Sequence, residues 1–159
     1  MSFGTLTLDR FNGQEQFSVE EAVIYVLNGD GSTRLNFEAA TGGPPLRTLP
    51  DTEVLKATPD VEVTVEAPGF AWDSLVGSRW EIPLGYDEES DDYVTRIYYC
   101  EHEEMDDNLV EVLERDGERF HVVITGTCTD VNFYDGSKPR TKVTIDAWFT
   151  PKGAEQAAS

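Results

Sequence analysis

The segment "RTKVTIDAWF", residues 140–149, alternates apolar and polar side chains with a period of two. Successive side chains of a β-strand point to opposite faces, so this pattern predicts a strand with one buried and one solvated face. Strands of this kind are typical of antiparallel sheets. The apolar parity carries Val143, Ile145, Ala147 and Phe149, and the other parity carries Lys142, Thr144, Asp146 and Trp148.

The same alternation recurs along the chain and predicts about nine strands. No long segment has the 3.6-residue period of an amphipathic helix, and only a single helical turn is expected, within residues 49–57 or residues 71–77. The pattern therefore predicts an all-β fold. The predicted strands cover residues 5–11, 16–27, 33–40, 60–68, 78–83, 93–100, 108–114, 119–129 and 140–149.

Turn-forming residues separate these strands. "NGDG" (residues 28–31) and "RDGE" (residues 115–118) predict tight hairpins, and "NFYDGSKPR" (residues 132–140) predicts a longer, aromatic hairpin loop. A two-residue turn at Asp116 and Gly117 would place Val112 opposite His121. The segment from residue 93 to residue 149 is therefore expected to form a C-terminal β-meander.

The strands are expected to form an antiparallel two-sheet β-sandwich, with a closed or flattened β-barrel as the alternative. Residues 41–60 contain four prolines, Pro44, Pro45, Pro50 and Pro59. Proline has no N–H to donate within a sheet, so this segment is interpreted as a connection between sheets and not as a central strand. We expect a single all-β domain over residues 1–152 and a flexible C-terminal tail over residues 153–159.

Charge is the extreme property of the composition. The chain has 31 acidic and 12 basic residues and a net charge of −19. Nucleic acids and anionic membranes are recognised by clustered Lys and Arg, so neither is expected as a partner. A protein with a basic surface is the expected partner, although the charge could also serve solubility or a saline environment. No transmembrane or signal segment is predicted, which favours a cytoplasmic protein.

One acidic stretch, "YYCEHEEMDD" (residues 98–107), combines residue types that bind metals. Strand geometry places its members on opposite faces, so a metal site is only the weaker alternative; it would use Glu101, Glu103, Asp106 and Asp107. A strand over residues 93–100 would hold this cluster about 25–30 Å from the acidic run at residues 87–92. Cys100 and Cys128 are expected to remain free thiols, and no cofactor is predicted.

Aromatic residues are the best binding candidates. Trp148 lies on the polar parity of its strand, and Phe133 and Tyr134 occupy a loop beside Lys138 and Arg140. Exposed aromatics often anchor interfaces or stack on sugars, but a covering loop or the core could instead bury these rings.

No catalytic motif is present, so the leading hypothesis is a non-enzymatic protein-interaction module. A small-ligand or carbohydrate-binding protein is the second hypothesis. A weak calcium-binding protein or an unfamiliar enzyme is the third.

Overall fold

The computed structural model describes residues 2–29 and 31–152 of the chain. The predicted tail over residues 153–159, and Asp30 in the first hairpin, lie outside the described residues. Every strand predicted from the alternation is present, and no α-helix occurs in the part of the chain that is described, so the all-β prediction is confirmed. None of the described helical segments is long and apolar enough to cross a bilayer.

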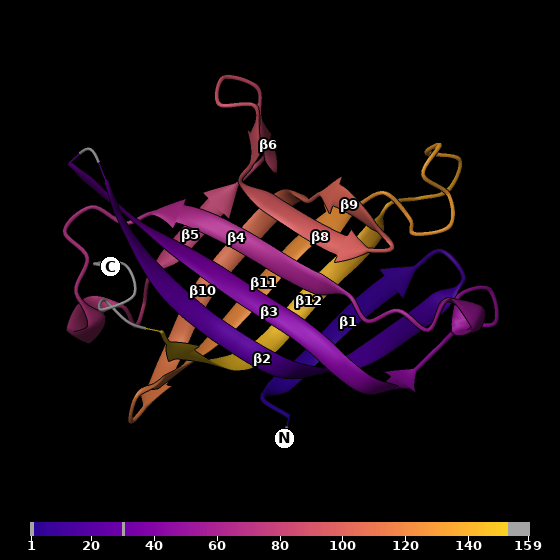
Figure 1. Cartoon of the computed structure of the whole chain (residues 1–159), viewed down its shortest axis with the longest axis horizontal. Helices are drawn as coiled ribbons and strands as arrows, with labels where there is room; N and C mark the ends of the chain where they lie inside the picture. Colours follow the sequence, from indigo (N-terminus) through magenta and orange to yellow (C-terminus); the bar gives the residue numbers. More distant parts are fainter. Residues whose placement is uncertain (1, 30, 153–159) are drawn as a thin grey trace.

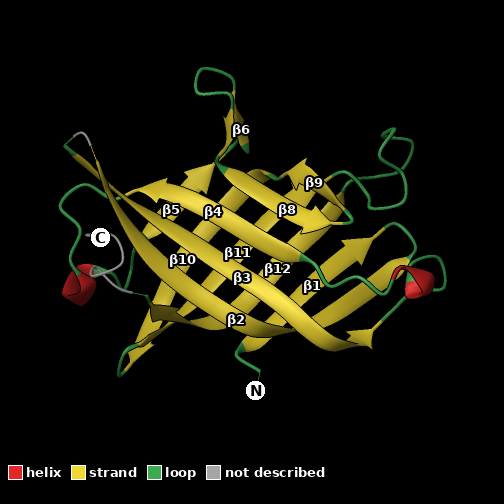
Figure 2. Ribbon diagram, in the orientation of Figure 1, coloured by secondary structure: helices red, strands yellow, loops and turns green. Residues whose placement is uncertain are grey.

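Ten strands form one sheet in the order β5-β10-β11-β12-β1-β2-β3-β4-β8-β9, with antiparallel neighbours throughout (Figures 1 and 2). The strands β6 (Tyr86–Asp87) and β7 (Asp92–Tyr93) form a second, two-stranded sheet. The large sheet comprises β1 (Gly4–Arg10), β2 (Gly13–Gly29), β3 (Ser32–Arg47), β4 (Asp60–Glu66), β5 (Arg79–Ile82), β8 (Thr95–Tyr99), β9 (Glu101–Glu104), β10 (Asp106–Asp116), β11 (Arg119–Cys128) and β12 (Thr141–Pro151).

The large sheet bends so that its two halves pack face to face, as the two layers of a sandwich do. The ring of Phe37 on β3 lies 5.9 Å from that of Phe149 on β12 and 6.0 Å from that of Trp80 on β5. Phe37 and Phe149 are fully buried, and burying such a side chain contributes about 1.5–3 kcal/mol. Over the described residues the end strands β5 and β9 share no ladder, so the sheet does not close into a barrel.

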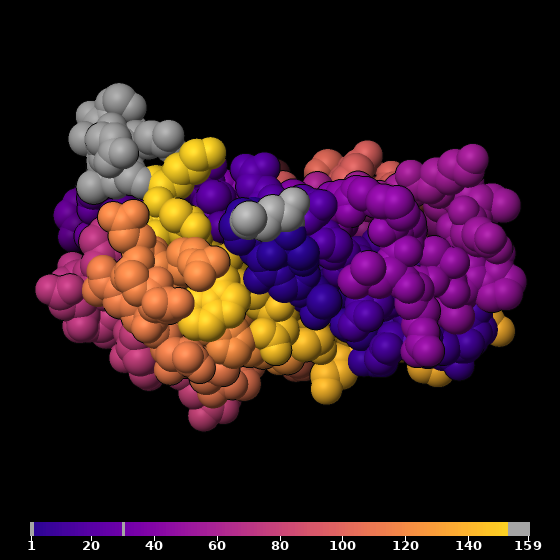
Figure 3. Space-filling view, turned by 90° about the horizontal axis from the view of Figure 1, so that it is seen from below, coloured from indigo at the N-terminus to yellow at the C-terminus, as the bar shows by residue number. Residues whose placement is uncertain are grey.

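The first and last strands of the chain, β1 and β12, are neighbours within this sheet. β1 pairs with β12 from Gly4 opposite Ala147 to Asp9 opposite Lys142, and Figure 3 shows these indigo and yellow segments side by side. A short parallel contact joins Thr150 to Val23 of β2. The predicted C-terminal meander is confirmed for β10-β11-β12, but its first strand is wrong, because β8 pairs with β4 and β9 and not with β10.

The proline-rich segment differs from its prediction. β3 continues through Pro44 and Pro45 to Arg47, although the pairing of β3 with β4 stops at Ala40. Beyond Ala40, β3 pairs with β2 alone. The β2–β3 ladder is irregular between the pairs Ser18–Gly42 and Gln16–Arg47, and the prolines lie in this irregular part, outside the ladder. A bulge at a strand edge is a position where a missing N–H costs no ladder hydrogen bond. A single helical turn is expected in one of two segments, and the structure has one in each, the short 3₁₀-helices η1 (Glu53–Leu55) and η2 (Trp72–Ser74).

The predicted register of the β10–β11 hairpin is wrong by one residue. Asp116 lies opposite Arg119, so the turn consists of Gly117 and Glu118. A β-bulge between Val112 and Glu114 adds one residue to β10 relative to β11. Because of this extra residue, the apolar side chains of β10 beyond the bulge again face the core. Val112 therefore faces Val122 and not His121.

The acidic stretch at residues 98–107 also differs from its prediction. The chain reverses at Cys100, which has a φ of 69°, so that β9 pairs back onto β8 with Glu104 opposite Arg96. Asp106 then returns to the base of the β6–β7 hairpin, where its carboxylate accepts a hydrogen bond from the backbone N–H of Gly85 at 2.9 Å. The expected placement of the two acidic clusters at opposite ends of one strand is therefore wrong. A left-handed non-glycine residue at a turn is uncommon and gave no sequence signal.

Candidate functional site

The predicted aromatic candidates do not form one surface. Trp148 is half-buried on the outer face of β12, where it stacks on His121 with ring centroids 5.2 Å apart. The loop at residues 129–140, called the 129–140 loop below, joins the other end of β12 at Thr141. Seven residues of strand separate Thr141 from Trp148, which corresponds to about 23 Å.

The predicted residues of the 129–140 loop have different environments. Phe133 makes an edge contact with Phe11 at 5.4 Å, and the ammonium of Lys138 lies 5.1 Å from the centroid of each ring. Arg140 pairs with Asp106 at 3.0 Å. Tyr134 instead packs against the core, so these residues do not present one binding face.

The predicted metal ligands do not converge. Glu101 and Glu103 line a pocket beneath the 129–140 loop, whereas Asp106 is engaged by Gly85 and Arg140. Asp107 is exposed at a left-handed position with a φ of 52°. Residues 2–29 and 31–152 contain no group of three His, Cys, Asp or Glu side chains arranged to hold a metal ion.

Both cysteines are free thiols, as expected, with Cys100 exposed and Cys128 buried. Burial raises the pKa of the Cys128 thiol to about 12. The thiol is therefore protonated at neutral pH, and this disfavours a nucleophilic role for Cys128.

Sequence reasoning missed a buried ionic cluster around Arg10. The guanidinium binds Asp130 through Nε at 2.8 Å, Glu15 through Nη1 at 3.1 Å and Asp51 through Nη2 at 2.7 Å. The side chains of Arg10, Glu15 and Asp130 have no exposed surface. Arg10 and Glu15 fall on the inward parity of β1 and β2, so a charged residue at an apolar position was the available signal.

Neighbouring hydroxyl groups complete this cluster. Tyr99 donates a hydrogen bond to Glu15 at 2.7 Å, and Thr141 donates one to Asp130 at 3.0 Å. The hydrogen bonds from Arg10 hold the pKa of Asp51 well below its usual range. Burial by itself would raise the pKa of Asp130, but the Arg10 and Asn132 hydrogen bonds outweigh it and lower this pKa. The cluster thus ties the 129–140 loop and the loop before η1 to β1.

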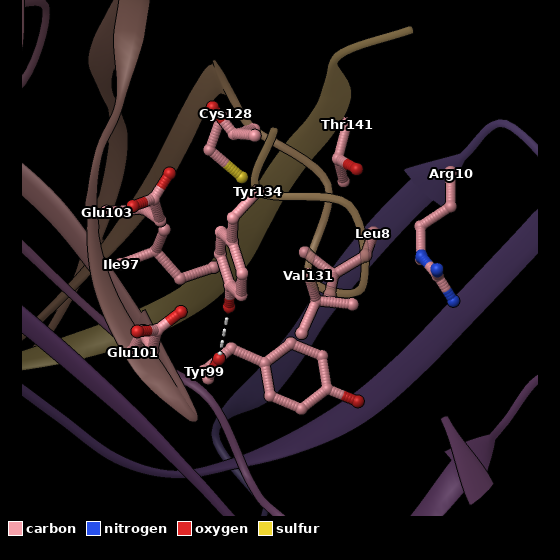
Figure 4. Close-up of a pocket in the computed structure, with 11 residues that line it drawn as sticks. Leu8, Arg10, Ile97, Tyr99, Glu101, Glu103, Cys128, Val131, Tyr134 and Thr141 are labelled. Carbon is pink, nitrogen blue, oxygen red and sulfur yellow. Dashed lines mark hydrogen bonds between the residues drawn. The ribbon is translucent and has the colours of Figure 1, made fainter. Parts of the chain in front are cut away.

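A small pocket, the inner pocket, lies between this cluster and the 129–140 loop (Figure 4). Its walls include Ile97, Cys128 and Val131, and the ring of Tyr134 lies among them. The Tyr134 hydroxyl donates a hydrogen bond to the backbone carbonyl of Tyr99 at 2.9 Å. With Tyr134 in place the remaining space is about 10 Å³, which is about the room needed by one water molecule.

A larger and more open hollow, the outer groove, crosses the solvent face of β2, β3, β4 and β8. It consists of two adjoining hollows of about 400 Å³ and 200 Å³, which share Glu38, Glu62 and Arg96. Tyr25 and Tyr93 stand at the larger hollow. Cross-strand pairing sets the floor, in rows that run Tyr25–Asn36–Thr64, Glu38–Glu62–Arg96 and Glu21–Ala40–Asp60.

The floor of the outer groove is held by its own polar contacts. Asn36, which is 6% exposed, donates hydrogen bonds to Glu62 at 3.0 Å and to Thr64 at 2.9 Å. Arg96 binds Glu62 at 2.6 Å and Asp60 at 3.2 Å. The short side chains of Asn36 and Thr64 leave space above the sheet, and longer neighbours on both sides form the walls.

The groove is strongly acidic. Its lining contains five carboxylates, from Glu21, Glu38, Asp60, Glu62 and Asp92, against the two guanidiniums of Arg34 and Arg96. Glu38 faces Glu62 directly across the β3–β4 ladder. Burial, followed by the charge of Glu62, raises the pKa of Glu38. Two like charges opposite each other destabilise a sheet, so a cation bound here would relieve a repulsion that already exists.

Comparison with known proteins gives no assignment. The chain matches no protein-family model, and no curated protein and no solved structure shows significant similarity to it. The function must therefore be argued from the charges, distances and hollows described above.

Proposed function

We propose that this protein is a non-enzymatic interaction module that binds a basic segment of a partner protein in the outer groove. The observation that carries this proposal is the composition of the groove, where five carboxylates face two guanidiniums across a hollow of about 400 Å³ and its extension of about 200 Å³. Charge complementarity of this kind mainly provides association rate and specificity.

The aromatic residues support a cationic occupant. Tyr25 and Tyr93 line the larger hollow, and Tyr93 is 40% exposed. A Lys or Arg side chain over the face of a tyrosine ring is attracted to it by about 0.5–1 kcal/mol at an exposed site. A basic segment lying along the groove would therefore meet rings at one end and the Glu21 and Glu38 carboxylates at the other.

The floor of the groove suits recognition without rearrangement. Asn36, Glu62 and Arg96 are linked by hydrogen bonds and ion pairs across three neighbouring strands. A binding surface that is already ordered loses less conformational entropy when its partner docks. Arg96 already forms ion pairs with Asp60 and Glu62, so Glu21 and Glu38 are the carboxylates most open to a partner's cation.

The proposal is tested with a fluorescein-labelled hexalysine peptide and fluorescence anisotropy at low salt. Wild-type protein should bind the peptide saturably, and the affinity should fall as salt is added, because screening weakens contacts between exposed charges. The double variant Glu21→Gln/Glu38→Gln should bind about tenfold more weakly, since two exposed ion pairs together contribute on the order of 1.4 kcal/mol.

The matched control is Glu53→Gln/Glu118→Gln, which removes the same charge from exposed positions outside the groove. This control should bind hexalysine as wild type does. Equal losses in the two double variants would show that net charge alone attracts the peptide, and the groove would then have no specific role. Absence of saturable binding to wild type would reject the proposed function itself.

A further inference from the structure

The inner pocket holds a phenol that the chain itself supplies. The ring of Tyr134 fills an apolar slot beside Ile97, Cys128 and Val131, and its hydroxyl donates to the carbonyl of Tyr99 at 2.9 Å (Figure 4). Shape and hydrogen bonding are thus both matched to a 4-hydroxyphenyl group. A slot that accepts this ring from a loop also fits the same ring on a separate molecule.

The loop that supplies the ring is fixed at its two ends. Asp130 is held by Arg10 and Thr141, and Arg140 is held by Asp106 and Thr127. Between these ends, among the described residues, the Tyr134 hydroxyl makes the single hydrogen bond from residues 133–139 to the body of the sheet. Withdrawal of Tyr134 from the slot would therefore break one hydrogen bond and leave both ends of the loop in place.

The rim of the pocket is acidic. Glu101 and Glu103 project from the same face of β9 and line the pocket beside Tyr134 (Figure 4). Burial, and then the charge of Glu101, raises the pKa of the Tyr134 phenol, because Glu101 lies beside the hydroxyl end of the ring. Burial also raises the pKa of Glu103. An ammonium group attached by a short chain to the ring carbon opposite the hydroxyl would meet the Glu103 carboxylate, which lies beside that end of the ring (Figure 4).

We propose that the inner pocket is a binding site for a phenolic amine, a 4-hydroxyphenyl ring carrying an ammonium group, and that Tyr134 occupies this site in the absence of ligand. The ligand ring takes the place of the Tyr134 ring, donates to the Tyr99 carbonyl, and directs its ammonium group to Glu103 at the opposite end of the slot. Tyr134 acts as an internal competitor, so the affinity of wild type is reduced by the fraction of molecules in which the slot is open.

The probe for the experiment is tyramine, and binding is measured by calorimetry and by chemical-shift changes. Tyr134→Ala removes the competitor and should bind tyramine at least about tenfold more tightly than wild type does. Tyr134→Phe keeps the ring without its hydrogen bond and should give an intermediate affinity, which provides a test if the alanine variant folds poorly. Phe133→Ala alters the same loop outside the pocket and should leave the affinity at the wild-type value.

Three further measurements test the chemistry of the ligand. Phenethylamine lacks the hydroxyl and 4-hydroxyphenylacetate lacks the cation, so each should bind Tyr134→Ala more weakly than tyramine does. The variant Tyr134→Ala/Glu103→Gln should lose affinity for tyramine and retain affinity for p-cresol. Tyr134→Ala/Glu101→Gln, changed at the hydroxyl end of the slot, should lose less affinity for tyramine. Glu21→Gln/Glu38→Gln should bind tyramine as wild type does, because the outer groove is a separate site.

Two results would overturn the inference. One is failure of both Tyr134→Ala and Tyr134→Phe to bind tyramine more tightly than wild type. The other is loss of tyramine binding in Glu21→Gln/Glu38→Gln, which would assign tyramine to the outer groove. Neither result changes the outcome of the hexalysine experiment, so each proposal can be rejected without rejecting the other.

Discussion

Two arginine–carboxylate clusters of this protein use the same groups in opposite ways. Arg10 has a fully buried side chain and binds Glu15, Asp51 and Asp130, whereas the side chain of Arg96 is 24% exposed and binds Asp60 and Glu62. Removing one member of a buried ion pair leaves an uncompensated charge, while an exposed pair contributes little to stability. The buried cluster is therefore expected to support the fold, and the exposed cluster is available for recognition.

The largest effect is expected from Arg10→Met. The substitution leaves Glu15 and Asp130 buried without their cation and should lower the free energy of unfolding by about 3–5 kcal/mol in urea titrations. Arg79→Met is the control, because the Arg79 side chain is 57% exposed and its contact with Glu81 is 3.6 Å long. If both substitutions lowered the free energy of unfolding by the same small amount, the distinction between a buried and an exposed cluster would be invalid.

The second effect concerns the hydroxyl group next to the buried cluster. Tyr99→Phe removes the hydrogen bond that Glu15 accepts at 2.7 Å, and hydrogen bonds to charged groups are worth about 1.5–3 kcal/mol. Thermal unfolding followed by circular dichroism should show a clear decrease in the melting temperature. Tyr98→Phe, at a ring that is 39% exposed, should leave the melting temperature unchanged. Similar decreases in the melting temperature of both variants would mean that the hydrogen bond to the buried Glu15 carboxylate has no special effect on stability.

The third prediction applies to the exposed cluster. Arg96→Ala should lower the free energy of unfolding by no more than about 1 kcal/mol, because the pairs with Asp60 and Glu62 are partly solvated. The same variant should bind hexalysine more tightly, since the outer groove gains one unit of negative charge. Chemical denaturation and anisotropy would give these two quantities on one sample. Weaker hexalysine binding would mean that Arg96 organises the groove for its ligand.

The last comparison depends on pH and has opposite signs in the two regions, and its Glu38 part is the smallest effect on stability that we expect. The pKa of Glu38 is raised in the folded protein, so its ionisation opposes folding above the unfolded-state pKa, and this penalty disappears as the pH falls through the folded-state pKa. Glu38→Gln should therefore stabilise the fold slightly at pH 7, by less than about 1 kcal/mol, and the gain should vanish in acid.

The pKa of Asp130 is lowered, so its contribution to stability is present above the unfolded-state pKa and is lost as the pH falls through the folded-state pKa. Asp130→Asn should accordingly lose stability at pH 7, and the loss should diminish in acid. Urea unfolding of both variants from neutral to acid pH measures these two trends. If the stabilities of both variants relative to wild type changed with pH in the same direction, the proposed contrast between the exposed and the buried cluster would be wrong.

Alternation of side chains predicted the strands well because each strand buries one face. Residues 140–149 and 60–68, for example, lie within or around β12 and β4, where the apolar parity is buried and the polar parity is at least partly exposed. Alternation gave no signal for β6, β7 and β9, which are short and rich in acidic residues. Their strand state depends on partners supplied by the fold, such as Arg96 opposite Glu104.

The candidate sites were predictable only in part. The prediction of a basic partner followed from the net charge of −19, but the outer groove depends on which outward-facing residues become neighbours. Glu38 and Glu62 are far apart in the sequence and lie opposite each other only because β3 pairs with β4 in one register. Tyr134 was identified as an aromatic loop residue, whereas its insertion beside Cys128 could not be inferred from the loop sequence.

The sequence by itself determined the class of fold, the inward and outward faces of the main strands, and the acidic character of the protein. These properties are local, because period-two alternation and charge are set by neighbouring residues. The tertiary structure decided the reversal at Cys100, the burial of Arg10 with three carboxylates, and the enclosure of Tyr134. Each of these depends on contacts between segments distant in the chain, whose energies are set by burial and by pairing register and not by the residues next to them in sequence.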